Sequence, residues 1–444
     1  VLSILRDAIP TATSSPDYFY KSANKNPITS RIGSGAGFTT CMEVTMNYPN
    51  PTKSISAISV SCKKISSIMS IGRIRWVALL FSTFCLLCAS ATLSAQTQLG
   101  ADIDGESAED SSGEVSLSSD GKRLAIGAPG NDGNGTDSGH VRIYEWSGMA
   151  WTQFGADING EAAYDYSGSS VSLSSDGNRL AIGAPGNDGS GSLSGHVRVY
   201  EWSDLSWTQL GSDIDGEATG DEVGLAVSLS SDGNRLAIGT PYNNGNSGHV
   251  RVLEWADSTW TQLGADIDAE EAEEYSGFSV SLSSDGNRLA NGAIWGSYTR
   301  VYQWSGTAWE QLGADIDGEQ AGDQSGRSVS LSDDGNRLAV GAPLNDGSGS
   351  ESGHARVYQW SGSAWTQLGS DIDGEAAGDE VGLALSLSSD GNRLAIGAPY
   401  NNDNAGHLRD FEWSDSTWSQ LGADIDAEAA ADYTGFSVSL SSDG

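Results

Sequence analysis

Residues 168–221 read GSSVSLSSDGNRLAIGAPGNDGSGSLSGHVRVYEWSDLSWTQLGSDIDGEATGD, and this stretch, which recurs along the chain, decides the fold. The pair Asp176-Gly177 separates the alternating run VSLS from the run RLAIGA, a strong signal for a β-hairpin. A second short polar turn, SDLS, separates HVRVYEW from WTQLGSDI. We therefore predict two hairpins per repeat, with strands near Val171 and Leu173 and at 179–184, 196–202 and 207–214.

The motif SLSSDG or a near copy occurs seven times, with its aspartate at Asp120, Asp176, Asp232, Asp285, Asp334, Asp390 and Asp443. Four short strands in a repeat of about fifty residues predict an all-β chain: a β-propeller of four-stranded antiparallel blades, about seven in number. A β-helix would use shorter coils, and a helical solenoid would need a helical apolar period that is missing. Gly211–Gly286 matches Gly369–Gly444, which indicates duplication of a three-repeat unit. Because the last copy stops within a hairpin turn, we expect a truncated C-terminus and six complete repeats with the start of a seventh.

The motif SVSLSxDGxRLAIGAP resembles the FG-GAP repeat of integrin α-chain N-terminal propellers and of exported microbial proteins. The resemblance covers essentially all of residues 96–444. GAP is literal at residues 127–129, 183–185, 341–343 and 397–399, whereas the FG half survives only around Phe278 and Phe436. Kelch repeats are the closest rival, but their double glycine is missing. The resemblance implies an extracellular recognition function and calcium loops of the form DxDxDG in the first hairpin, where this chain has SLSSDG and retains only Asp176 and its equivalents.

The first 95 residues differ in composition from the rest. Met69 precedes SIGRIR, an apolar run from Trp76 to Ala89 and the small-residue tract SATLSA, which is the layout of a secretory signal peptide at 69–95. We expect cleavage after Ala95; a retained anchor is the alternative, although the run is short for a membrane span. Residues 1–68 are interpreted as an over-extended reading frame, with a disordered prosegment as the alternative. All four cysteines lie before residue 96, so packing must stabilise residues 96–444.

Residues 96–444 hold 14 basic and 56 acidic residues, a formal charge of −42. Such a charge repels phosphate, so nucleic acid is not an expected partner. We expect the mature protein to have no membrane span, and the oligomeric state is left open. The second and third strands and the successive repeats are joined at the same face of a propeller, and only the loop between the second and third strands varies in length. We therefore predict that ligands bind on that face; drift in the length of a loop without function is the alternative.

The connections between repeats carry a regular acidic pattern, DIDGEAAGD and its relatives, with acids at i, i+2, i+4 and i+8. Oxygen ligands at alternate positions followed by a more distant carboxylate are typical of calcium loops, so calcium is a possible cofactor, and a solvated acidic face is the alternative. The candidate ligands are Asp102, Asp104, Glu106, Asp110; Asp213, Asp215, Glu217, Asp221; Asp315, Asp317, Glu319, Asp323; Asp371, Asp373, Glu375 and Asp379, and three related linkers begin at Asp157, Asp266 and Asp424. The candidate ligand-binding loop residues are Asn131, Asp132, Asn187, Asp188, Asn243, Asn345, Asp346 and Asn401.

The five histidines begin the third strand in different repeats, so we predict structural roles for them and no shared metal or catalytic site. Arginines recur at two strand positions, as at Arg179 and Arg198, and are expected to pair with acids. The Trp pairs, such as Trp202 and Trp207, are expected to pack within blades.

Every chemically notable residue is repeated, whereas a catalytic site is normally one asymmetric constellation, so we predict no enzyme. The predicted function is adhesion to, or recognition of, an extracellular protein or glycan, secreted or at a cell surface. The alternatives are an accessory or spacer propeller of a larger exported enzyme, or a structural surface protein.

Overall fold

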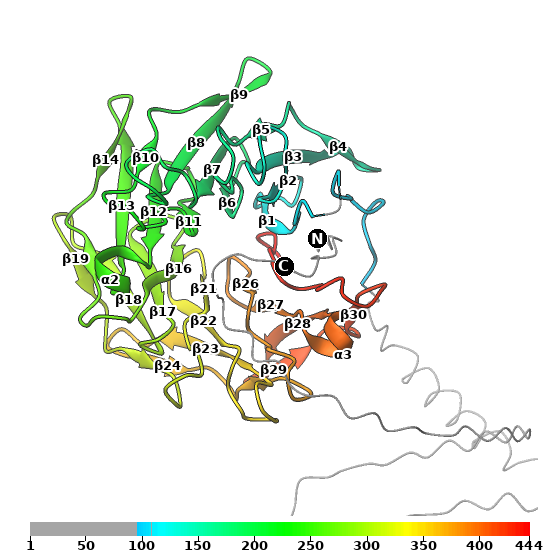
Figure 1. Cartoon of the computed structure of the whole chain (residues 1–444). Helices are drawn as coiled ribbons and strands as arrows, with labels where there is room; N and C mark the ends of the chain where they lie inside the picture. The colour runs from blue at the N-terminus through cyan, green and yellow to red at the C-terminus, as the bar shows by residue number, and fades with distance from the viewer. Residues whose placement is uncertain (1–95, 108) are drawn as a thin grey trace, which may run out of the picture. The chain divides into compact units, whose positions relative to one another are not determined.

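The computed structural model describes residues 96–107 and 109–444, which form a β-propeller (Figure 1). The predicted signal peptide and the segment before it lie outside the described residues. Each of six antiparallel sheets has four strands in sequence order and a short fifth strand that pairs with the third. The all-β propeller fold is confirmed. The prediction of about seven blades is wrong, because the described residues form six sheets and the seventh repeat start, residues 434–444, forms no strand.

The strands of equivalent position have closely similar bounds in the six blades. The first strands are β1 (Glu114–Leu117), β6 (Ser170–Leu173), β11 (Ala226–Leu229), β16 (Ser276–Leu282), β21 (Ser328–Leu331) and β26 (Leu385–Leu387). The second strands are β2 (Arg123–Ala128), β7 (Arg179–Ala184), β12 (Arg235–Thr240), β17 (Arg288–Ala293), β22 (Arg337–Ala342) and β27 (Arg393–Ala398). The third strands are β3 (His140–Trp146), β8 (His196–Ser203), β13 (His249–Ala256), β18 (Tyr298–Trp304), β23 (His354–Trp360) and β28 (His407–Ser414).

The outer part of each blade contains two short strands where the sequence predicted one. The fourth strands are β4 (Trp151–Gln153), β9 (Ser206–Gln209), β14 (Thr259–Gln262), β19 (Trp309–Gln311), β24 (Trp365–Gln367) and β29 (Thr417–Gln420). The fifth are β5 (Ile158–Asn159), β10 (Ile214–Asp215), β15 (Ile267–Asp268), β20 (Ile316–Asp317), β25 (Ile372–Asp373) and β30 (Ile425–Asp426). The continuous strand predicted for 207–214 is therefore wrong. Gly211 interrupts it with a φ of 86°, and a Cβ there would lie 2.8 Å from the Trp255 ring.

The first hairpin of each blade forms as its sequence predicts. In β6 and β7, Val171 pairs with Ile182 and Leu173 with Leu180. In the turn, Asp176 Oδ1 accepts hydrogen bonds from the Ser174 hydroxyl at 2.7 Å and the Asn178 backbone N–H at 2.9 Å. The aspartate thus closes the turn by satisfying donors that the ladder leaves open.

Hydrophobic packing between successive blades forms the core. Val197 and Val199 of β8 cluster with Leu236 and Ile238 of β12, and all four are buried. Blades approach one another closely at the glycine of the second strand. A Cβ on Gly183 would lie 1.9 Å from the backbone carbonyl oxygen of the next blade's Gly224. The small residues of this strand are therefore required by the contact between blades.

Serine hydroxyls of the first strands link the blades around the centre. The Leu173 N–H donates to Ser116 Oγ at 2.9 Å, and the Leu229 N–H donates to Ser172 Oγ at 3.0 Å. These contacts explain why serine alternates with apolar residues in the VSLS motif. In Figure 1 the first strands lie innermost and the fourth strands lie at the rim.

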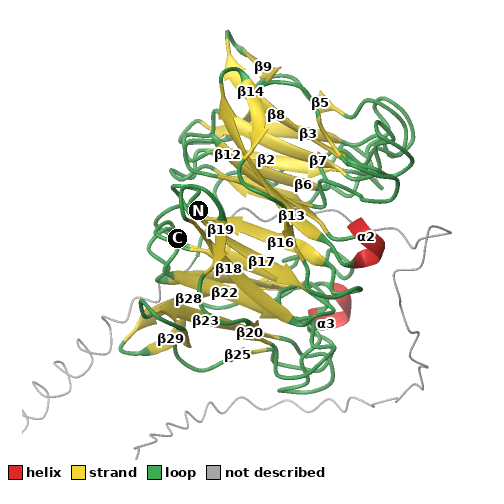
Figure 2. Cartoon of the chain, turned by 90° about the vertical axis from the view of Figure 1, so that its left-hand side faces the viewer, coloured by secondary structure: helices red, strands yellow, loops and turns green. Residues whose placement is uncertain are grey.

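The loop between the second and third strands lies on the same face as the linker between blades, as predicted. Asn345 of one such loop donates to Asp323 of the preceding linker at 2.8 Å. The shorter loops of the third and sixth blades contain single turns, α2 (Asn243–Asn246) and α3 (Asn401–Asn404), which share one side of the sheets in Figure 2. No helix among residues 96–107 and 109–444 has the length and apolar content needed to cross a bilayer.

Candidate functional site

An arginine on the third strand holds two acids from successive linkers. In the fifth blade, Arg356 donates through Nε and Nη2 to Asp371 at 3.0 and 2.8 Å, and it also contacts Glu319. The second, first and fourth blades repeat the arrangement around Arg198, Arg142 and Arg300. The predicted pairing of these arginines with acids is confirmed, and it connects consecutive linkers to the blade between them.

Charge and burial act in opposite ways on neighbouring groups of this cluster. The Arg356 guanidinium holds the pKa values of Asp371 and Glu319 below their usual range through hydrogen bonds. His354 precedes Arg356 by two residues and so projects from the same face of β23. Burial lowers the pKa of His354, so its imidazole is neutral near pH 7. The neutral ring is compatible with a metal ligand, while the arginine already neutralises the adjacent acids.

In the part of the chain that the structure describes, five groups of one histidine and two acids could hold a metal ion, with ligand atoms within 4.8 Å of one another. They are Glu106, His140 and Asp157; Glu161, His196 and Asp213; His249, Asp266 and Asp268; Glu319, His354 and Asp371; and Glu375, His407 and Asp424. The sequence had suggested no metal role for the histidines because they do not meet one another. Instead, each one meets acids of the linkers around its own blade.

The third and sixth blades differ because their arginine turns away from the first acid of the following linker. Arg251 Nη2 donates to the Asp215 carbonyl oxygen and Arg409 Nη2 to that of Asp373, each at 2.9 Å. The Nε2 atoms of His249 and His407, like Nδ1 of His354 in the fifth blade, have no hydrogen-bond partner within residues 96–107 and 109–444. Histidine nitrogen and carboxylate oxygen together suit zinc better than calcium, and in the third and sixth blades the arginine does not pair with the first acid of the following linker.

The four acids predicted as a calcium loop have separate partners within each linker. In the linker from Asp213 to Asp221, Asp213 accepts from Gln209 and Arg198, whereas Asp221 is buried and accepts two backbone N–H groups of its own turn. Asp215 is exposed, and Glu217 lies 3.7 Å from Arg251. The linkers beginning at Asp102, Asp315 and Asp371 follow this plan in their buried last acid and exposed second acid. Calcium binding there stays a prediction.

The predicted loop residues are of two kinds: asparagines, most of them buried, and exposed aspartates. Asn131, Asn187, Asn345 and Asn401 are buried, and Asn243 donates to Asp221 at 3.2 Å. Exposed aspartates follow the longer loops' asparagines, and each accepts a backbone N–H of its own loop; they are Asp132, Asp188 and Asp346. The asparagines therefore shape the loops, and the aspartates are the members available to a ligand.

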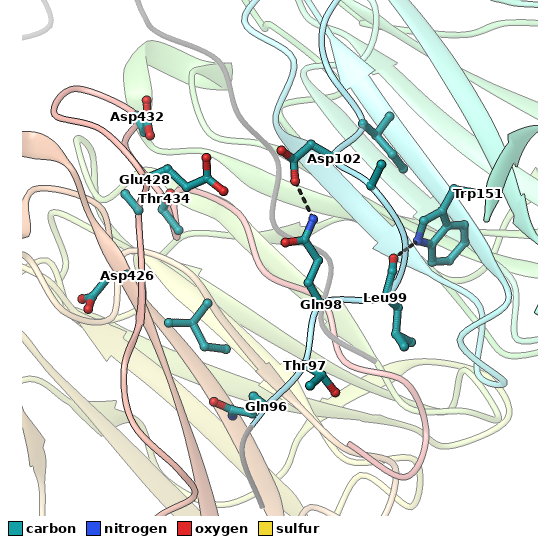
Figure 3. Close-up of a pocket in the computed structure, with 14 residues that line it drawn as sticks. Gln96, Thr97, Gln98, Leu99, Asp102, Trp151, Asp426, Glu428, Asp432 and Thr434 are labelled. Atoms are coloured by element: carbon teal, nitrogen blue, oxygen red, sulfur yellow. Dashed lines mark hydrogen bonds between the residues drawn. The ribbon is translucent and has the colours of Figure 1, made fainter. Parts of the chain in front are cut away.

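A pocket of about 230 Å³ lies between residues 96–103 and residues 425–434 (Figure 3). One wall is fixed by two hydrogen bonds, from Gln98 to Asp102 at 2.5 Å and from Trp151 Nε1 to the Leu99 carbonyl oxygen at 3.1 Å. The opposite wall contributes three acidic side chains, Asp426, Glu428 and Asp432. The pocket is therefore acidic at its rim, with apolar lining from Ile103 and Ile425. The sequence had marked Asp102 as a candidate calcium ligand and the linker that begins at Asp424 as a related acidic pattern, but it had not indicated a pocket between them.

Comparison with known proteins identifies the repeat. The FG-GAP repeat family matches residues 159–200 and 315–358, so the chain contains FG-GAP repeats in a β-propeller. No curated protein matches the chain in sequence.

Solved propellers share the fold at low sequence identity. The periplasmic gluconolactonase of Pseudomonas aeruginosa is 18% identical with a TM-score of 0.51, covering 74% of this chain and 87% of its own. Hydrazine synthase of Kuenenia stuttgartiensis is 14% identical with a TM-score of 0.52, covering 79% and 94%. A functionally unknown protein of Desulfotomaculum acetoxidans is 13% identical with a TM-score of 0.52, covering 75% and 94%. At such identities the likeness concerns the fold alone.

Proposed function

We propose that this propeller is a non-enzymatic recognition module, secreted or held at a cell surface, that binds an extracellular protein or glycan through the face formed by its linkers and the loops between second and third strands. The observation that carries the proposal is that the four acids of each linker differ in their partners within the protein. The first, third and fourth acids of a linker have hydrogen-bond or ion-pair partners within the protein, although the third acids are also exposed, whereas the second acid is exposed in every linker that has one. These acids are Asp104, Asp215, Asp268, Asp317, Asp373 and Asp426.

A rigid support with exposed acids at equivalent positions suits a ligand that brings positive charge. Apart from Asp104, each of these aspartates lies at the end of a short fifth strand that is paired with the third strand, so its carboxylate is held by a ladder. Charges presented in this way raise the encounter rate with a cationic partner and lose effect as salt screens them. We therefore expect a basic protein surface, or an amine-bearing glycan, to bind more tightly than a neutral one.

The test compares two variants with the same change in charge. In the first, Asp215, Asp268 and Asp373 become Asn; in the second, the exposed turn residues Asp204, Asp257 and Asp415 on the opposite face become Asn. Both are measured against a panel of immobilised extracellular proteins and glycans at two salt concentrations. We expect at least one panel member to lose tenfold or more affinity with the first variant and little with the second. Equal losses with both variants, or no binding by the wild-type chain, would refute the proposal.

A further inference from the structure

Three aromatic side chains from three separate segments meet where the third blade adjoins the fourth. Tyr275 of the linker lies edge to face with Tyr242, which precedes α2, with ring centroids 5.5 Å apart and ring planes at 84°. Tyr275 also contacts Trp295 of the loop between β17 and β18, with ring centroids 6.4 Å apart and planes inclined at 56°. Trp295 is 53% exposed, and it is the one tryptophan of residues 96–444 outside the six repeated pairs. We call Tyr242, Tyr275 and Trp295 the aromatic cluster.

Tyr242 and Trp295 occupy the same position of the repeat, directly after the GAP motif or its variants GTP and GAI. In the first, second and fifth blades this residue is not aromatic: it is Gly130, Gly186 or Leu344. Those three blades have 22 residues from the aspartate of the first hairpin turn to the arginine of the third strand, whereas the third and sixth blades have 19 and the fourth has 15. The aromatic residues therefore accompany the shorter loops, which leave less chain to cover them.

The backbone around the aromatic cluster is fixed by hydrogen bonds. The Trp295 N–H donates to the Glu274 carbonyl oxygen at 3.3 Å, and the Tyr275 N–H donates to the Asn246 carbonyl oxygen at 3.0 Å. The Glu274 carboxylate accepts the Tyr298 hydroxyl at 2.7 Å. Tyr298 is buried and replaces the histidine that begins the third strand of every other blade. The fourth blade thus departs from the repeat at Trp295 and at Tyr298, and Glu274 connects the two departures.

The linker that carries Tyr275 is the most acidic of the seven. Residues 266–275 contain six acids and no lysine or arginine, whereas the equivalent ten residues of the other linkers contain three to five acids. Glu271 and Glu273 are exposed, and Glu273 precedes Tyr275 by two residues. Aromatic ring faces are themselves negative, so carboxylates beside them favour a cationic ligand.

We propose that the aromatic cluster binds an organic ammonium group, and that a quaternary ammonium is the class that fits it best. Ring faces attract such a cation within about 6 Å of the ring centroid, and tryptophan attracts it most strongly. Because the planes of Tyr275 and Trp295 are inclined, they suit a compact group that contacts two walls, whereas a sugar ring stacks on one flat face. The inference deepens the proposed recognition function, on which it rests, by naming the chemical group that the ligand brings to this face.

The probe is choline, titrated into the full chain and followed through the line width of its N-methyl signal in NMR spectra. The comparison is its neutral isostere, in which a tert-butyl group replaces the trimethylammonium group. The two probes have the same shape, so a difference in affinity measures the contribution of the charge. We expect choline to bind with a millimolar Kd, and the isostere about tenfold or more weakly.

Two variants of the aromatic cluster test its location. Trp295→Ala and Tyr275→Ala should each weaken choline binding about tenfold, and Trp295→Phe, which keeps a ring, should weaken it about threefold. The matched control is Tyr164→Ala, which removes a 54% exposed ring from the linker between the first and second blades and should leave the affinity unchanged. Circular dichroism confirms that each variant is folded. Trp295→Phe keeps the test valid if an alanine variant does not fold.

The proposal is overturned if choline binds no more tightly than its isostere, or if the folded Trp295 variants leave choline binding unchanged. It is also overturned if Tyr164→Ala weakens binding as much as Trp295→Ala does. Binding of neutral methyl glycosides that depends on Trp295, without choline binding, would show a platform for sugars and would likewise contradict it.

Phosphocholine and trimethyllysine amide distinguish two sources of the ammonium group. The acidic linker repels phosphate, so we expect the lysine derivative to bind more tightly. Tighter binding of phosphocholine would support the site and identify a choline head group as its ligand. Failure of choline to bind would leave the result with the panel of extracellular proteins and glycans unaffected, and failure of that panel would leave choline binding intact. The two hypotheses therefore fail separately.

Discussion

The variant Asp379→Ala tests whether the last acid of a linker stabilises the fold through hydrogen bonds or by binding calcium. The Asp379 carboxylate is 3% exposed and accepts the backbone N–H groups of Glu375 and Ala376 at 3.1 and 2.8 Å. Its other oxygen accepts the Asn401 side-chain amide at 3.0 Å, which connects linker to loop. Removing the carboxylate leaves three donors without their partner in a place with little access to water.

The expected loss of unfolding free energy is about 3 kcal/mol, since a hydrogen bond to a charged group contributes roughly 1.5–3 kcal/mol and water recovers part of the loss. For a domain of about 350 residues this corresponds to a fall in Tm of about 4 °C. Calorimetry and urea unfolding measure both quantities. The control is Asp373→Ala in the same linker, which removes an exposed carboxylate and should change stability by less than about 0.5 kcal/mol.

Measuring the stability of wild type and Asp379→Ala both in calcium and in chelator distinguishes the two roles. An ion bound to the native linker would stabilise the wild-type chain in proportion to its occupancy, and a chelator would remove that part. If Asp379 acts through the hydrogen bonds, the difference between wild type and Asp379→Ala is the same in calcium and in chelator. A difference that exists only in calcium would refute this reasoning and support the calcium prediction, and a loss below about 1 kcal/mol in both conditions would refute the assigned role of the hydrogen bonds.

Three further expectations concern the blades. Gly183→Ala places a methyl group 1.9 Å from a carbonyl oxygen of the next blade, so we expect severe destabilisation or loss of soluble protein, measured by expression yield and circular dichroism. Trp365→Phe removes the 2.9 Å bond to the Leu312 carbonyl oxygen and should cost about 1 kcal/mol in urea unfolding, without changing the overall circular dichroism spectrum. Because Arg356 lowers the pKa of Asp371 below 3.8, their pairing stabilises the native state above that pH and is lost as pH falls through the folded pKa. The stability difference between wild type and Arg356→Gln should therefore shrink below about pH 4.

The sequence predicts the blades well because their signals are local. The Asp176-Gly177 turn, the alternation around Val171 and the paired small and apolar residues of 179–184 all act over a few positions, and the structure confirms each. The break between β9 and β10 was missed because a glycine in an otherwise apolar strand does not indicate by itself what lies next to it. Only the fold brings the Trp255 ring of the next blade against Gly211.

The sequence indicated which arginines and acids form the candidate site, but not which acids from different linkers meet at one arginine. The recurrent interval of fifteen residues from Arg142 to Asp157, and from Arg356 to Asp371, was a usable signal for the ion pairs. The meeting of Glu319 with Arg356 was not, because those residues belong to different repeats and are united only by the position of the linker. A pattern read along one linker thus suggested a calcium loop, whereas its acids belong to two different clusters.

Asp410 departs from the apolar pattern of its repeat position, and only the arrangement of the blades explains why a carboxyl is tolerated there. Its counterpart in the duplicated unit is Val252, which packs against Leu289 of the following blade. A carboxyl in such a contact would lose hydration without gaining a partner, a cost that a closed interface between blades has no means to offset. In the sixth blade the same carboxyl has the Gln96 amide beside it, and burial raises its pKa. The polar residue is thus tolerated at a third strand against which residues 96–107 and 109–444 place no further complete blade, whereas Val252 packs against one.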